Sequence, residues 1–339
     1  MGFFMRNGGL TNLSPYATIY LNMRRIIILI LACIWVVSVS PAYAYWIWTP
    51  KTGKWVNPKT MVKPTPKEQY DYAMEFYNLK KYDEAIREFK KLIKAYPKSF
   101  EASESQFYMG RSEEEKNNLY EAFLAYQKVV DKYPFSERIK DIIDREYKIG
   151  EIFMSGEKRK ALGVPLPVEN PSIEIFAKVV ENSTYGPIAP KAQYKLGLVL
   201  KGLERFDESE EAFNKVVTNY PDSEWVEPAK FQIASCRAAL SRGPEYDSGS
   251  ANEAKEKFES FLKDHPDAVL SKEAEQNISK LREKEAASNY NIALFYEKQK
   301  AYQSARIYYN EVVDKYSDSN WVTKAQEKLR ALDKLEKKK

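Results

Sequence analysis

The chain has 339 residues, of which 44% are hydrophobic and 30% charged, and its net charge is +5. Basic and acidic residues are interleaved along most of it, which is typical of solvated helix faces and excludes the continuous basic tract that nucleic-acid binding favours. One histidine, two cysteines and the lack of a phosphate-binding loop or hydrolase motif exclude common metal, cofactor and catalytic sites, so an enzyme is not expected.

Residues 1–44 have the features of an export signal. Arg24 and Arg25 precede an apolar run over residues 26–39, and an Ala-x-Ala cleavage sequence ends at Ala44. The run is shorter than the about 20 apolar residues that a transmembrane helix needs. We therefore expect cleavage after Ala44, with residues 1–22 as an upstream extension if translation starts at Met23.

Cys33 offers an alternative N-terminus. It ends the sequence Ile30-Leu31-Ala32-Cys33, a loose match to a bacterial lipobox, in which the cysteine becomes the lipidated first residue. The apolar run continues beyond it and a better cleavage site follows, so Ala44 is favoured while Cys33 remains a candidate for lipidation. The other cysteine, Cys236, lies in an apolar helical stretch and is expected to be a small buried side chain.

Residues 45–65 are predicted to form a Trp-rich hairpin and a linker. Two short alternating runs, which contain Trp46, Trp48 and Trp55, flank the turn sequence Pro50-Lys51-Thr52-Gly53. Trp favours boundaries between water and apolar surfaces, so the hairpin is interpreted as an aromatic foot that touches a partner or a membrane interface. The alternative is that it packs on the first repeat or stays unattached.

A repeat begins after this linker. In residues 82–99, four apolar side chains spaced i, i+4, i+7 and i+11 lie along one side of an α-helix. Residues 67–79 have the same periodicity, so the two segments are expected to pair as an antiparallel helical hairpin. Close copies of the second helix follow at residues 120–134, 206–221 and 302–317.

The repeat matches the tetratricopeptide (TPR) pattern. Ala85 and Ala122 are 37 residues apart, close to the TPR period of about 34. The small residues Ala73 and Gly110 are expected to let paired helices approach closely, and a proline after the second helix ends it. The predicted fold class is all-α: a right-handed TPR-type α-solenoid of five to six helix pairs with a C-terminal capping helix, preceded by the signal peptide and the hairpin.

The solenoid is predicted over residues 66–318 and the capping helix over residues 319–339. Long inner loops at residues 156–170 and 241–250 are expected to project from the third and fifth hairpins. Residues 271–300 contain no helix breaker and should form one long helix. The final helix ends in four charged residues and supplies the polar outer face that the end of a solenoid needs.

The first helices of TPR hairpins build a concave face, which is predicted to bind an extended apolar or aromatic peptide. The residues expected to line it in the first three repeats are Tyr70, Met74, Tyr77, Phe107, Arg111, Tyr147, Glu151 and Met154. The alternative is that roughly half of them pack between neighbouring first helices.

The chain resembles the BamD family, the TPR lipoproteins of the outer-membrane β-barrel assembly machinery. Besides the export signal, repeats and long third loop, residues 289–302 are similar to the family's late sequence A-x-F-Y-x-K-x-x-A-Y. The resemblance covers roughly residues 66–330. It implies a periplasmic scaffold associated with the outer membrane, whose N-terminal repeats receive unfolded β-barrel precursors. Its C-terminal repeats would dock on a barrel-forming assembly protein, through Tyr290, Phe295 and Tyr296.

Two features depart from this family. Its members usually carry a clear lipobox, whereas Cys33 is a poor match, and the Trp-rich hairpin is an addition. We therefore expect peripheral membrane contact at most. The alternative function is a soluble periplasmic TPR adaptor for cell-wall synthesis or a secretion system, which would not copurify with a β-barrel assembly protein.

Overall fold

The computed structural model describes residues 46–50, 53–57, 61–161, 164–165, 169–241 and 248–336. The chain divides into two units, Met1–Val62 and Lys63–Lys339. The predicted signal peptide and the lipidation candidate Cys33 lie outside the described residues. Within the described ranges, no helix combines the length and the apolar character needed to cross a bilayer.

In the first unit, the predicted hairpin is present. Strands β1 (Ile47–Thr49) and β2 (Lys54–Val56) pair in antiparallel orientation, with Trp48 directly opposite Trp55. Gly53 closes the turn with a φ of 62°, and its N–H donates to the carbonyl of the residue four positions earlier at 2.9 Å. Glycine adopts this left-handed conformation without the steric cost that a Cβ would add.

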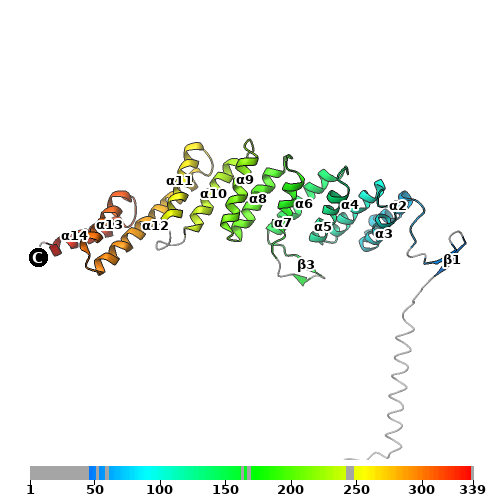
Figure 1. Cartoon of the computed structure of the whole chain (residues 1–339), viewed down its shortest axis with the longest axis horizontal. Coiled ribbons are helices and arrows are strands. Elements are labelled where there is room, and N and C mark those ends of the chain that lie inside the picture. Colours follow the sequence, from blue (N-terminus) through cyan, green and yellow to red (C-terminus); the bar gives the residue numbers. More distant parts are fainter. Residues whose placement is uncertain are drawn as a thin grey trace, which may run out of the picture. The chain divides into compact units, whose positions relative to one another are not determined.

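The second unit consists of antiparallel helix pairs that follow one another in chain order, which confirms the predicted all-α solenoid (Figure 1). Six pairs and a final helix are described: α2 (Pro66–Asn78) with α3 (Tyr82–Ala95), α4 (Phe100–Glu115) with α5 (Leu119–Lys132), α6 (Ile139–Met154) with α7 (Ser172–Asn182), α8 (Ala189–Gly202) with α9 (Phe206–Asn219), α10 (Val226–Leu240) with α11 (Ser248–Asp264), α12 (Ser271–Lys298) with α13 (Tyr302–Lys315), and α14 (Val322–Glu336).

In the second, third and fourth pairs, an aromatic ring of the second helix meets a glycine of the first. A Cβ added to Gly110 would lie 2.4 Å from a ring carbon of Tyr126, and one added to Gly197 would lie 2.6 Å from Phe213. Such contacts are shorter than van der Waals packing permits, so these helices approach as closely as they do because the side chain is absent. The predicted role of the small residue is confirmed for Gly110.

Four of the inner turns share one backbone conformation. Their turn residues have φ between 58° and 61°, although none is glycine: Lys80, Asn117, Glu204 and Lys300. In the first hairpin, the N–H of Lys81 donates to the carbonyl of Phe76 at 2.9 Å, which satisfies one of the unpaired carbonyls at the end of α2. The third and fifth hairpins instead have longer loops, as predicted.

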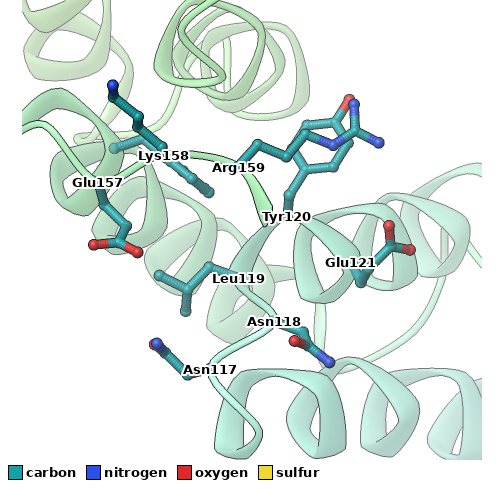
Figure 2. A pocket seen from close by; sticks show the side chains of 9 residues that line it. Asn117, Asn118, Leu119, Tyr120, Glu121, Glu157, Lys158 and Arg159 are labelled. Carbon is teal, nitrogen blue, oxygen red and sulfur yellow. The ribbon is translucent and has the colours of Figure 1, made fainter. Parts of the chain in front are cut away.

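The loop of the third hairpin does not simply project. It contains a short antiparallel ladder of β3 (Lys160–Ala161) and β4 (Val164–Pro165). Before the ladder, the guanidinium of Arg159 lies 3.8 Å from the ring centroid of Tyr120 on α5 (Figure 2). This cation–π contact holds the start of the loop against the neighbouring pair.

Helix α12 is the predicted long helix, and it serves two cores. Its first half packs Ala274 and Leu281 against α10 and α11. Its second half packs Tyr290 and Ala293 against α13 and α14. The two halves of α12 therefore have different neighbours. The side of α12 that α11 covers in the first half is not covered by another helix of the described residues in the second half.

Candidate functional site

Two rings of the predicted groove are covered by the next repeat. The side chains of Phe107 and Tyr147 are only 2% and 5% exposed. The guanidinium of Arg138 lies 4.9 Å from the ring centroid of Phe107, and the ammonium of Lys191 lies 4.8 Å from that of Tyr147. Both rings therefore pack between repeats, and the expectation that they offer a face to a bound peptide is corrected.

The same arrangement recurs towards the C-terminus with tryptophan in place of the cation. Tyr194 lies 5.0 Å from Trp225 and Tyr290 lies 5.1 Å from Trp321, measured between ring centroids, and both ring planes meet at 40°. Each tryptophan follows its tyrosine by 31 residues, a signal in the sequence that our sequence reasoning missed. Tyr290 is 9% exposed, so it belongs to the core and does not itself present a docking surface.

The first repeat contributes a cluster of half-buried rings. Tyr70 and Tyr77 on α2 lie 6.2 and 5.1 Å from the ring of Tyr108 on α4. Burial raises the pKa of both Tyr70 and Tyr77 above the usual value for tyrosine. Met74 is also partly buried against this cluster. The edges of these side chains remain the part of the predicted groove that a peptide can reach.

The polar members of the predicted groove are engaged with neighbouring side chains. Arg111 pairs with Glu115 at 3.3 Å on its own helix. Glu151 accepts a hydrogen bond from the hydroxyl of Tyr147 at 2.9 Å and pairs with Lys195 of α8 at 3.2 Å. Met154 packs partly buried between the third and fourth pairs. The Glu151–Lys195 pair and the packing of Met154 join the third pair to the fourth, whereas the other two contacts lie within a single helix.

The charge of the first helices changes sign along the solenoid. Helix α4 contains five glutamates and one arginine, whereas α8 contains three lysines and no acidic residue. One of these, Lys201, donates to Gln232 and Ser235 of α10, both at 2.7 Å, and burial lowers its pKa. The other two lysines of α8 also contact a neighbouring pair, Lys191 over the ring of Tyr147 and Lys195 with Glu151, so the basic groups of this helix join it to its neighbours.

A buried carboxyl on α6 lies between the second and third pairs. In the second and fourth pairs, Gln106 and Gln193 each donate to a carbonyl of the second helix at 3.0 Å. The third pair has Glu146 at this position, fully buried and accepting from the amide of Gln127 at 2.8 and 2.9 Å. Burial raises the pKa of Glu146 to about 8, so it is mostly protonated at neutral pH.

Exposed apolar side chains gather at the sixth pair. Ile292 and Phe295 on α12 are 37% and 58% exposed. Ile292 continues the stripe of Ala274 and Leu281 that the first half of α12 buries against α11. The neighbouring Tyr296 stacks on Tyr308 of α13, with ring centroids 5.6 Å apart. Of the three predicted docking residues, Phe295 is thus the one whose ring faces solvent.

The cavities in the described part of the chain differ in size. A shallow hollow lined by Tyr185, Pro187 and Tyr220 has a volume of about 720 Å³ and lies open at the surface. The cavity beside α5, lined by Leu119, Tyr120 and Arg159, has a volume of about 30 Å³ (Figure 2). That volume holds about one water molecule. Across the described residues, His, Cys, Asp and Glu side chains form no group of three that could hold a metal ion.

Family comparisons agree with the repeat architecture. Residues 70–137 and 191–223 match tetratricopeptide-repeat families, and residues 241–337 match the family described as outer membrane lipoprotein (YfiO), which is the BamD family. The chain is a TPR protein that resembles BamD. The BamD-like match spans α11, the whole of α12, α13 and α14, and so includes the exposed side chains Ile292 and Phe295.

Several solved TPR structures are similar at low identity. The C-terminal part of a TPR repeat-containing protein from Cytophaga hutchinsonii is 20% identical, with 74% of this chain and 83% of that one covered and a TM-score of 0.34. A TPR protein from Parabacteroides merdae is 13% identical over 73% and 91% of the two chains, with a TM-score of 0.31. MamA is 21% identical over 59% and 92%, with a TM-score of 0.32. No curated protein matches the chain. These values carry no argument about function.

Proposed function

We propose that this protein is a non-enzymatic scaffold of the bacterial cell envelope that assists the assembly of β-barrel outer-membrane proteins. Its sixth helix pair is the end that docks on a barrel-forming assembly protein. The observation that carries the proposal is the exposed pair Ile292 and Phe295, which lies within the segment that matches the outer membrane lipoprotein family.

The physical argument starts from the two cores of α12. The apolar stripe of this helix needs a neighbour along its whole length, but α11 covers only the first half and α13 covers a different side of the second half. Ile292 and Phe295 are left in contact with water. Fully burying a side chain of this size contributes about 1.5 to 3 kcal/mol, and 37% of Ile292 and 58% of Phe295 remain to be covered. A partner that covers both therefore gains roughly the contribution of one such side chain, which is at least about tenfold in affinity.

The surroundings of this pair suit a protein partner. Lys298 and Lys300 are exposed beside it, and such a polar rim around an apolar centre is common in protein interfaces. The N-terminal repeats would receive the unfolded precursor, where the accessible edges of Tyr70, Met74 and Tyr77 contact its aromatic side chains. The protein would act in the periplasm at the outer membrane.

The test is copurification from detergent-solubilised envelopes. We expect the double variant Ile292→Ala, Phe295→Ala to recover about tenfold less of the barrel-forming protein than wild type, because two anchoring side chains are lost. Phe135→Ala is the matched control, since this ring is 99% exposed in the turn after α5. It should recover the partner at the level of wild type.

Two results would contradict the proposal. Equal recovery by both variants would show that the sixth pair is not the docking end. If wild type instead recovers a component of cell-wall synthesis or of a secretion system and no β-barrel protein, the adaptor function replaces the one proposed.

A further inference from the structure

The three indoles of the hairpin share one face. Residues directly opposite each other in an antiparallel pair point to the same side, which places Trp48 and Trp55 together. Trp46 precedes Trp48 by two residues and therefore points the same way. These three side chains are 56%, 47% and 63% exposed in chain order, and the rings of Trp48 and Trp55 lie 5.8 Å apart.

The hairpin has little core of its own. On its opposite face, Ile47 is 43% exposed and Val56 is half-buried. Two strands alone cannot enclose a hydrophobic interior, and an isolated hairpin is at best marginally stable in water. Docking of the indole face on another surface would therefore order the hairpin as well as bury its rings.

The sequence segment that carries this face has charges of one sign only. Residues 1–67 contain no Asp or Glu, whereas residues 68–339 contain 45 basic and 48 acidic residues. The positive excess of the chain thus lies entirely in the segment that holds the hairpin. Five lysines occur from residue 51 onwards, at positions 51, 54, 59, 63 and 67, and Lys67 is neutralised by Asp71 at 2.6 Å.

We propose that the indole face of the hairpin binds the surface of an anionic lipid bilayer. Indoles settle at the headgroup level, where the ring is buried and the N–H stays hydrated, and lysines beside them are attracted to lipid phosphates. A segment with three indoles, several lysines and no acidic residue in its sequence matches this chemistry. This inference rests on the proposed function in one respect only, since the proposed function places the protein beside a membrane.

Vesicle sedimentation of the purified protein tests this inference. Wild type should bind vesicles that contain phosphatidylglycerol about tenfold more tightly than vesicles of phosphatidylcholine alone, and added salt should weaken that preference. The variant Trp46→Ser, Trp48→Ser, Trp55→Ser should lose about tenfold in affinity for the anionic vesicles. Lys51→Gln with Lys54→Gln should reduce the preference for anionic lipid and leave the weaker binding to phosphatidylcholine.

A second readout is intrinsic fluorescence. Anionic vesicles should shift the emission of wild type to shorter wavelength, and the shift should vanish in the triple variant, which keeps Trp225 and Trp321. Circular dichroism must show unchanged helix content. Copurification of the barrel-forming protein should survive the triple substitution, which separates this inference from the proposed function.

The proposal would be overturned if the triple variant bound anionic vesicles as tightly as wild type, which is also the result expected if an acyl chain alone provides attachment. It would equally be overturned if soluble peptidoglycan fragments bound wild type more tightly than vesicles do, since the indole face would then be a glycan platform.

Discussion

The two ends of the solenoid treat their aromatic side chains differently. In the second and third pairs, Phe107 and Tyr147 lie beneath cations supplied by the next repeat. In the sixth pair, Phe295 is 58% exposed, and no helix among the described residues covers that side of α12. An aromatic residue at a groove position is thus mainly a packing residue, and a ring becomes available for binding where the stacking of helices is interrupted.

The largest change in stability is expected from a substitution in the fourth pair, which lies between the two ends of the solenoid. Phe213 is fully buried against Gly197 in the fourth pair, so Phe213→Ala should lower the free energy of unfolding by about 3 to 5 kcal/mol. Because solenoids are stabilised by contacts between nearest neighbours, the two halves should then unfold separately. Urea unfolding followed by circular dichroism measures both effects.

The exposed neighbour Asn214 provides the control for this variant, since Asn214→Ala should change the free energy of unfolding by less than about 0.5 kcal/mol. A single transition of Phe213→Ala at the midpoint of wild type would contradict the account of nearest-neighbour coupling.

A smaller effect is expected from uncovering a ring at the N-terminal end. Arg138 donates from two nitrogens to Glu104, at 3.0 and 2.8 Å, while it lies over Phe107. Arg138→Ala removes a charged hydrogen-bond donor from a mostly buried carboxylate and should cost about 1.5 to 3 kcal/mol of unfolding free energy. Arg138→Lys keeps the charge without the two-pronged contact and should cost less.

The same urea titrations measure both arginine variants. If Arg138→Ala is as stable as wild type, the contact of Arg138 with Phe107 and Glu104 does not stabilise the packing of the second pair on the third. The difference between the two ends of the solenoid would then have no effect on stability.

The effect that is smallest when taken per pH unit concerns the buried carboxyl of Glu146. The folded-state pKa of Glu146, about 8, lies above its ordinary value of 4.5. Between pH 4.5 and pH 8, the folded protein therefore keeps on Glu146 a proton that the unfolded chain has released. Stability should therefore fall as pH rises through this window, by at most about 1.4 kcal/mol per pH unit. Glu146→Gln should remove this contribution and keep the interior hydrogen bonding.

The measurement is the free energy of unfolding of wild type and Glu146→Gln at several pH values between these limits. The slope of wild type should be steeper than that of the variant. Parallel slopes would show that Glu146 is ionised in the folded protein.

The helices and their pairing could be predicted from the sequence because their causes are local. Periodic apolar residues, Gly110 and Gly197 opposite rings, and the absence of breakers in α12 are all visible in short stretches. The covering of Phe107 by Arg138 could not be predicted in this way, because it depends on how one repeat stacks on the next. Arg138 follows Phe107 by 31 residues. The exposure of Phe295 likewise depends on which helices are present on each side of α12.

The central claim is that the sixth pair docks on a barrel-forming assembly protein. Photocrosslinking in living cells tests it directly, with a photoreactive phenylalanine analogue at position 295 and, in a separate strain, at position 135. Position 295 should crosslink to an outer-membrane β-barrel assembly protein, and position 135, which is more exposed but lies in a turn of the second pair, should not. Crosslinks to that protein from position 135 alone, or equally from both positions, would contradict the claim.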